Sequence, residues 1–129
     1  MERTGLSIAE AADLTGLTPD TLRYYEKGGL MLREVPRGTS GHRRYEDADL
    51  TWVRLITKLR STGMPIRDVR RYADLVRAGD GNEQERLDLL QAHRQVVLAR
   101  LAEVQDHLGA IDFKIGLYED KLATTLRSA

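Results

Sequence analysis

Hydrogen-bond donors crowd one short segment of the chain, residues 18–26, which reads Thr-Pro-Asp-Thr-Leu-Arg-Tyr-Tyr-Glu. A Thr in the N-cap position followed by Pro in the first helical position predicts that a helix begins here. The side chains that can bond phosphate oxygens are Thr18, Thr21, Arg23, Tyr24 and Tyr25. Arg23 can also read a base edge. A helix that only packs in a core has no need of such a cluster, so the segment indicates a helix that lies against DNA.

A shorter helix is expected just before this segment. Ser7 and Glu10 have the spacing of a capping box, and Gly16 ends the apolar pattern that follows them. A helix, a tight turn with glycine and a second helix that starts with polar donors form a helix-turn-helix. The alternative interpretation of these residues alone is a helical hairpin in another kind of bundle.

Residues 33–45 combine turn-forming residues with positive charge. Four Arg lie within the twelve residues from 33 to 44, and glycine and serine occupy the centre of the segment. This pattern predicts a two-stranded β-hairpin wing with a basic tip and return strand, rather than an ordinary solvated hairpin with scattered charge. The wing residues that we expect to contact the DNA backbone are His42, Arg43, Arg44 and Tyr45.

The net charge of the 129-residue chain is zero, which taken alone argues against a nucleic-acid partner. The charge is unevenly distributed, however. From Arg23 to Arg71 the chain has twelve Lys and Arg against six Asp and Glu, a local excess of six positive charges. The local potential governs the encounter with phosphate. Because the basic stretch coincides with the predicted recognition helix and wing, DNA remains the expected partner.

Two further helices are expected after the wing, from Glu46 to Arg60 and from Met64 to about Arg77, each closed by a nearby glycine. The second of them carries Arg67, Arg70 and Arg71 on its first turns. These three side chains are either a solvated basic face or further contacts to phosphate, and the sequence alone leaves both interpretations open.

The last third of the chain predicts one long helix with an apolar stripe. Between residues 87 and 122, stripe positions recur at alternating intervals of three and four over five heptads, with Arg94 as the one charged position. Such a helix is longer than a small head can cover, so the stripe requires a second copy of the chain. The expected dimer contacts are Leu87, Leu90, Val97, Leu101, Val104, Leu108, Ile111, Ile115 and Tyr118. We therefore expect a homodimer built on a coiled coil.

Four motifs in order along the chain resemble those of the MerR family of transcription regulators. They are Ser-Ile-Ala-Glu-Ala-Ala at 7–12, Thr-Leu-Arg-Tyr-Tyr-Glu at 21–26, Gly-His-Arg-Arg-Tyr at 41–45 and Leu-Arg-Ser-Thr-Gly-Met at 59–64. The resemblance covers the whole chain. It implies an all-α fold with a small β-hairpin wing, in which a winged helix-turn-helix domain precedes a long coiled-coil dimerisation helix.

The same resemblance implies a function. A dimer of this family binds a near-palindromic promoter element and distorts the DNA so that RNA polymerase can engage it. The resemblance also implies that Arg67 lies in a second wing that touches phosphate. It further implies that the dimer helices pair antiparallel, although the charges beside the apolar stripe would suit a parallel pair.

Within the family, the chain most resembles a branch that senses reactive aldehydes or thiol stress through a cysteine. This chain has no Cys, and Lys58 stands where that branch has it. The lack of Cys also excludes disulfides and thiolate metal sites. The spacing of His42, His93 and His107 does not make a metal-binding set. No metal or other cofactor is therefore expected, and an inducer, if there is one, is not identified.

We expect a DNA-binding domain at 1–79 and a dimerisation helix with a short tail at 80–129, with a glycine-containing turn between them. The sequence shows no signal peptide and no transmembrane run, so a cytoplasmic protein is expected. An enzyme is not expected, because the chain has no paired carboxylates in an apolar setting and no phosphate-cradling glycine loop. Two other functions remain open: a winged-helix architectural or recombination accessory factor, and a coiled-coil adaptor whose head binds protein.

Overall fold

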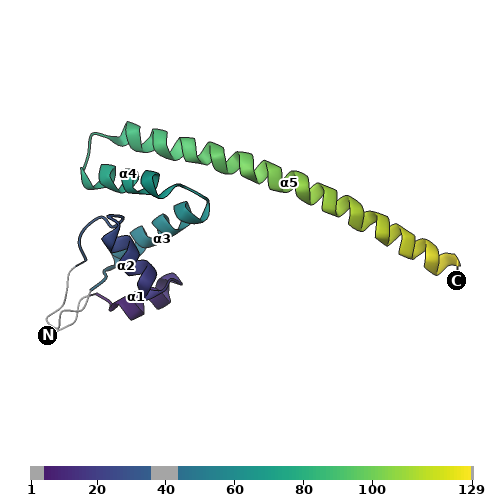
Figure 1. Ribbon diagram of the computed structural model, residues 1–129, viewed down its shortest axis with the longest axis horizontal. Coiled ribbons are helices and arrows are strands. Elements are labelled where there is room, and N and C mark those ends of the chain that lie inside the picture. Colours follow the sequence, from purple (N-terminus) through teal and green to yellow (C-terminus); the bar gives the residue numbers. More distant parts are fainter. Residues whose placement is uncertain (1–4, 36–43, 129) are drawn as a thin grey trace. The chain divides into compact units, whose positions relative to one another are not determined.

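The computed structural model describes residues 5–35 and 44–128. Its helices are α1 (Ile8–Thr15), α2 (Pro19–Lys27), α3 (Asp47–Ser61), α4 (Ile66–Arg77) and α5 (Glu83–Ser128) (Figure 1). The chain divides into two compact units, Met1–Gln91 and Ala92–Ala129. We call the first unit the head and the second unit the arm, and each is described by itself.

The first two helices begin and end at the residues that the sequence predicts. The Ser7 hydroxyl accepts from the Glu10 amide at 3.1 Å, and the Glu10 carboxylate accepts from the Ser7 amide at 3.0 Å, so the capping box is formed. Gly16 ends α1 with a φ of 73°, a conformation that glycine adopts without strain. Thr18 caps α2 by accepting from the Thr21 amide at 3.1 Å. The predicted helix-turn-helix is therefore confirmed.

Side chains from every part of the head meet in one core. Its most deeply buried large side chains are Tyr45, Leu22, Leu30, Ile56, Met64, Val35, Val53 and Val69. The rings of Trp52 and Tyr72 stack with 5.7 Å between their centroids and so join α3 to α4. Because α2, α3 and α4 all contribute to this core, the position of the predicted recognition helix depends on the two helices that follow it.

The first turns of α5 belong to the head. Leu89 and Leu90 pack against the core. Before them, the Asn82 side chain donates to the Leu75 carbonyl at 2.8 Å. The Glu83 carboxylate accepts hydrogen bonds from its own backbone amide and from that of Gly81, which lowers its pKa. The first compact unit accordingly extends to Gln91, and the boundary at 79 between a DNA-binding domain and a dimerisation helix stays a prediction.

The arm is a continuation of α5, which runs unbroken over 46 residues and so measures about 70 Å. No residue in this helix is buried within the described chain. The stripe positions from Leu101 to Tyr118 expose about half of each side chain, from 49 % at Leu101 to 57 % at Val104. The predicted long helix is therefore confirmed, and its stripe faces solvent in the single chain.

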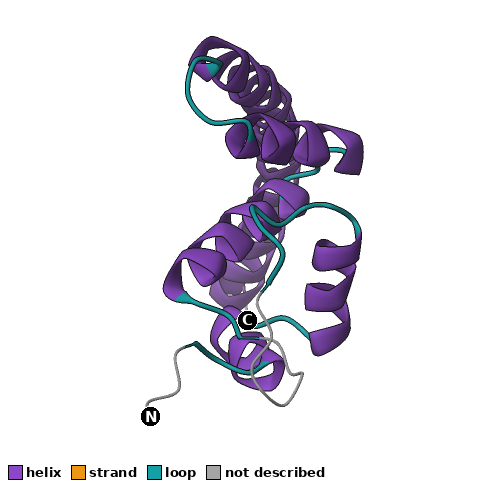
Figure 2. Cartoon of the chain, turned by 90° about the vertical axis from the view of Figure 1, so that its left-hand side faces the viewer, coloured by secondary structure: helices purple, strands orange, loops and turns teal. Residues whose placement is uncertain are grey.

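The predicted β-hairpin wing falls largely on residues 36–43, which lie outside the described residues. The described part of the chain contains no strand (Figure 2). The isolated bridge within it joins Tyr45 to Leu6 through two backbone hydrogen bonds of 2.7 Å. A β-hairpin wing is therefore not supported in the described residues, because those on either side of residues 36–43 form no strand. The fold as described is all-helical.

Candidate nucleic-acid interface

The first two turns of α2 present four of the predicted DNA-contacting side chains. Tyr24 is 51 % exposed, and the Arg23 side chain is 43 % exposed. Arg23 Nη1 lies 2.9 Å from a carboxylate oxygen of Asp20, in an exposed pair that solvent and salt weaken. The hydroxyls of Thr18 and Thr21 lie 3.0 Å apart at the start of the helix. These side chains offer hydroxyl and guanidinium donors, the groups that bond phosphate and base edges.

Two tyrosines that the sequence analysis assigned to DNA belong to the core instead. Tyr25 is 5 % exposed, and its hydroxyl lies 3.3 Å from that of Thr57 on α3. Tyr45 is 1 % exposed. Residue type cannot separate Tyr24 from Tyr25, but helical spacing can, because Tyr25 lies three residues after the buried Leu22 and so shares its face. The two buried rings leave little surface for a DNA contact.

The remaining wing residues are only partly within the described chain. His42 and Arg43 lie outside it. Arg44 is partly exposed and directly precedes Tyr45, whose backbone is held by Leu6. The return side of the predicted wing is therefore anchored to the head at Tyr45.

Arg33, which the sequence analysis counted with the basic wing, forms an ion pair in the head. Its Nη2 lies 2.6 Å from Oδ2 of Asp49, a carboxylate that is 4 % exposed. The same oxygen accepts from the Glu46 amide at 2.8 Å. A buried carboxylate needs such partners to offset its lost hydration. Arg33 precedes residues 36–43 and Glu46 follows them. Because both donate to Asp49, this carboxylate links the two ends of that segment.

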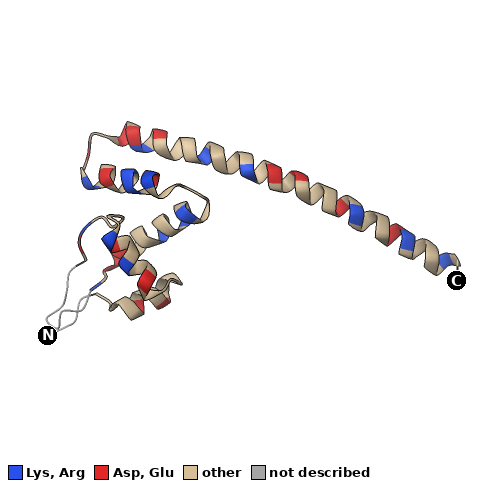
Figure 3. Ribbon diagram, in the orientation of Figure 1, with Lys and Arg blue, Asp and Glu red and all other residues tan. Residues whose placement is uncertain are grey.

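Positive charge predominates on α4, whereas both signs occur along α5 (Figure 3). The α4 arginines nevertheless differ in what they bind. The Arg67 side chain is 85 % exposed, and its Nε lies 3.9 Å from the carboxylate of the next residue. Arg70 Nε donates to the Gly28 carbonyl at 2.7 Å, and Arg71 pairs with Glu85 at 3.3 Å. Arg67 thus lies beside the carboxylate of its sequence neighbour, whereas Arg70 and Arg71 bond groups farther along the chain, a difference that the sequence did not reveal.

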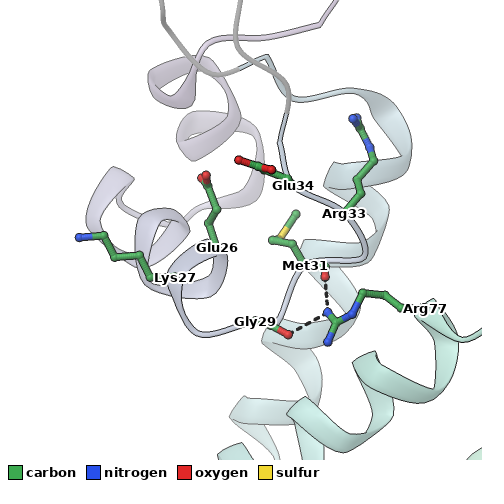
Figure 4. Close-up of a pocket in the computed structure, with 7 residues that line it drawn as sticks. All are labelled: Glu26, Lys27, Gly29, Met31, Arg33, Glu34 and Arg77. Atoms are coloured by element: carbon green, nitrogen blue, oxygen red, sulfur yellow. Dashed lines mark hydrogen bonds between the residues drawn. The ribbon is translucent and has the colours of Figure 1, made fainter.

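The end of α2 borders a hollow of about 370 Å³ (Figure 4). Arg77 lines it from α4 and donates through Nη1 to the carbonyls of Gly29 at 2.9 Å and Met31 at 2.5 Å. The sequence did not predict this role of Arg77. The sequence does place Arg77 seven residues after Arg70, a spacing that puts both side chains on one face of a helix and could have indicated a shared role.

Within the described ranges, no group of three or more His, Cys, Asp or Glu side chains is placed to hold a metal ion. In the same part of the chain, no helix is both long and apolar enough to cross a membrane.

Known proteins match this chain over most of its length. Residues 6–75 match the family model of the MerR HTH family regulatory protein, and residues 50–112 match the model described as MerR, DNA binding. An uncharacterized HTH-type transcriptional regulator of Haemophilus influenzae is 37 % identical over 113 residues, which cover 88 % of this chain and 83 % of the relative.

Two solved structures are similar in both sequence and fold. HiNmlR, a MerR family regulator lacking the sensor domain and bound to promoter DNA, is 36 % identical with a TM-score of 0.79, over 91 % of this chain and 92 % of that one. A MerR family regulator from Listeria monocytogenes is 32 % identical with a TM-score of 0.88, over 96 % and 93 % of the two chains. These relatives are regulators rather than enzymes. This chain therefore belongs to the MerR family and is a DNA-binding transcription regulator.

Proposed function

We propose that the chain acts as a homodimer, which binds a near-palindromic promoter element in double-stranded DNA and distorts it. The observation that carries the proposal is the exposed stripe of the arm. Its apolar side chains from Leu101 to Tyr118 are about half open to solvent and follow heptad spacing. Such a stripe gains free energy when a second helix covers it. A second copy of the chain offers a stripe of the same length and pattern.

Two copies of the chain provide two heads, and a palindrome is the DNA site that two identical heads read. The family resemblance favours an antiparallel pair of helices, and we adopt that arrangement. The dimer contacts would be the stripe residues Leu87, Leu90, Val97, Leu101, Val104, Leu108, Ile111, Ile115 and Tyr118. Leu90 is shared, since it also packs on the head core.

In each head, we propose that α2 lies against the DNA with Thr18, Thr21, Arg23 and Tyr24. The exposure of Tyr24 and Arg23 supports this placement. Arg67 would contact phosphate from α4. His42, Arg43 and Arg44 would contact the DNA backbone from the wing segment, whose β-hairpin form the described residues do not support. The promoter-bound structure of HiNmlR, which is similar over nearly the whole chain, supports a promoter as the target.

The distortion gives this dimer its effect on transcription. A promoter whose elements are too widely spaced would be bent and untwisted until RNA polymerase can engage both, so the sequence-dependent deformability of the site would contribute to recognition. We place this activity in the cytoplasm, where bacterial promoter DNA lies. No separate cofactor is part of the proposal.

Selection of bound duplexes from a random-sequence pool tests this function. We expect an enriched near-palindrome, hereafter the operator, that binds two chains per duplex. Energy transfer between dyes at the two ends of the operator should rise on binding, because bending brings the ends together. Enrichment of one asymmetric half-site, or one chain per duplex, would contradict the dimer. An unchanged end-to-end distance would contradict the distortion.

A further inference from the structure

Four consecutive backbone carbonyls at the exit of α2 each accept a hydrogen bond from a side chain of α3 or α4. Arg70 donates to Gly28 at 2.7 Å, and Trp52 Nε1 donates to Leu30 at 2.6 Å. Arg77 Nη1 donates to both carbonyls that remain, those of residues 29 and 31, at 2.9 and 2.5 Å. Figure 4 draws the two bonds from Arg77. We call these three side chains the carbonyl clamp.

The carbonyl clamp supplies hydrogen-bond donors to the turn that follows α2. The last carbonyls of α2 accept from the backbone amides of Gly28, Gly29 and Leu30, whereas the carbonyls of the turn itself take their donors from elsewhere in the head. Cations near a helix C-terminus are favoured by its dipole. Here the chain leaves α2 through Gly29, whose φ of 72° reverses its direction. The four carbonyls that follow the helix lie in this turn, and a hollow of about 370 Å³ borders it. Leu30 and Met31 of this turn are buried in the core, and the donors of α3 and α4 bond the carbonyls of the turn.

Trp52 and Arg77 are themselves held in the head by further contacts. Trp52 is 6 % exposed and stacks on Tyr72 of α4. Arg70 and Arg77 are seven residues apart, so both project from one face of α4, and Arg77 also pairs with Asp74. At the level of Cα atoms α2 approaches α1 and none of the other described helices. Beyond the core contacts of its own side chains, α2 is therefore tied to α3 and α4 through the clamp.

We propose that Arg70 and Arg77 are positioning residues for DNA recognition: by holding the exit turn of α2 on α4, they set the orientation in which Arg23 and Tyr24 meet the DNA. The proposal rests on the proposed function, because it takes α2 as the helix that reads the operator. Neither arginine touches DNA in this account. Their effect is on the discrimination between operator and other sequences rather than on the general attraction of the head for phosphate.

The test compares the double variant Arg70→Met and Arg77→Met with the wild type on the operator and on a scrambled duplex, over a range of salt concentrations. Arg71→Met is the matched control, since it removes a charge from the same helix but only breaks the exposed pair with Glu85. We expect the ratio of the two affinities to fall about tenfold or more in the double variant, as it does when a side chain no longer reads its base. Its salt dependence should stay as steep as that of the control, because neither arginine bonds phosphate.

Two results would overturn the proposal. An unchanged affinity ratio would mean that the clamp does not set the orientation of α2. A salt slope reduced by about one unit per arginine, with the ratio kept, would mean that both side chains contact phosphate instead. A wild type that does not distinguish operator from scrambled DNA would contradict the proposed function itself, whatever the variants do.

A conservative variant keeps the test decisive if the double variant fails to fold. One nitrogen of Arg77 serves two carbonyls, so a single ammonium can replace it. Arg77→Lys should therefore keep most of the discrimination that Arg77→Met loses. Amide hydrogen exchange at Leu30, whose N–H bonds the Tyr25 carbonyl at 3.0 Å, should be faster in Arg77→Met and unchanged in Arg71→Met. Equal discrimination in Arg77→Lys, Arg77→Met and the wild type would overturn the proposal.

Discussion

The head and the arm use the same apolar residue types but treat them in opposite ways. In the head, Leu22, Val53 and Ile56 are at most 1 % exposed, whereas in the arm Leu108 and Ile111 are more than half exposed. Helices from distant parts of the sequence meet in the head and cover one another. A single straight helix has no second element to cover its stripe. The apolar pattern of the head is therefore satisfied within one chain, whereas that of the arm is left exposed and would be covered by a second chain in the proposed dimer.

The largest effect is expected when the same change, Ile to Ala, is made once in the head and once in the arm. Ile56→Ala leaves a cavity in a fully buried site and should lower the free energy of unfolding of the head by roughly 2–5 kcal/mol. Ile111→Ala is the matched change in the arm. It should leave the unfolding of the head unchanged and act only on dimer dissociation.

Chemical denaturation at several protein concentrations separates the two effects. Tryptophan fluorescence follows the head, because Trp52 is the one tryptophan of the chain. The effect of Ile111→Ala should depend on the protein concentration, because this change acts on dimer dissociation. The destabilisation caused by Ile56→Ala should be the same at every protein concentration. If both substitutions lowered the free energy of unfolding of the head equally, the head would not be stable independently of the arm, and the comparison would fail.

The next effect concerns the surface of the head. Arg23→Ala should weaken binding to the operator by roughly 1–3 kcal/mol if Arg23 reads a base, with much less effect on scrambled DNA. Lys27→Ala, at the far end of the same helix, is the control for the removal of a charge. Titration of both variants on the two duplexes is the measurement. An equal weakening on the two duplexes would mean that Arg23 holds only phosphate.

The smallest effect is expected from the predicted wing. Arg43→Ala together with Arg44→Ala should weaken binding to all duplexes about equally. The slope of log affinity against log salt should fall by roughly one unit for each arginine that bonds a phosphate in the wild type. Paired substitutions of Lys114 and Lys121 in the arm provide the control, since they remove the same charge from a region outside the head. A slope that stays as steep as in the control would remove the wing from the interface.

The sequence predicts the helices of this chain well because their signals are local. The capping box of Ser7 and Glu10 and the cap of Thr18 act within three residues, and the heptad stripe repeats every seven. The residues that face the core follow the helical period and are predicted by it. Residue type alone misplaced Tyr25, whereas its spacing from Leu22 would have placed it correctly.

The interactions that the sequence did not predict join residues far apart along the chain. Arg70 bonds a carbonyl 42 residues away, and Arg33 pairs with a carboxylate 16 residues away. The sequence left Arg70 open between a solvated face and a phosphate contact and placed Arg33 in the basic wing, because an isolated positive charge carries no information on its partner. Only the packing of α3 and α4 on the exit of α2 decides between a carbonyl and a phosphate. The sequence therefore indicated a basic DNA-binding head but not which of its arginines bond groups within the head.

The most direct test of the account is the mass of the double variant Leu101→Asp and Leu108→Asp by sedimentation equilibrium. The two changes would put four carboxylates into one dimer seam, where even partial desolvation costs on the order of several kcal/mol for each unpaired charge. The account predicts a monomer at micromolar concentration, with a folded head and a much weaker affinity for the operator. A variant that remains a dimer at that concentration would contradict the account, because the dimer would then be built without the stripe of the arm.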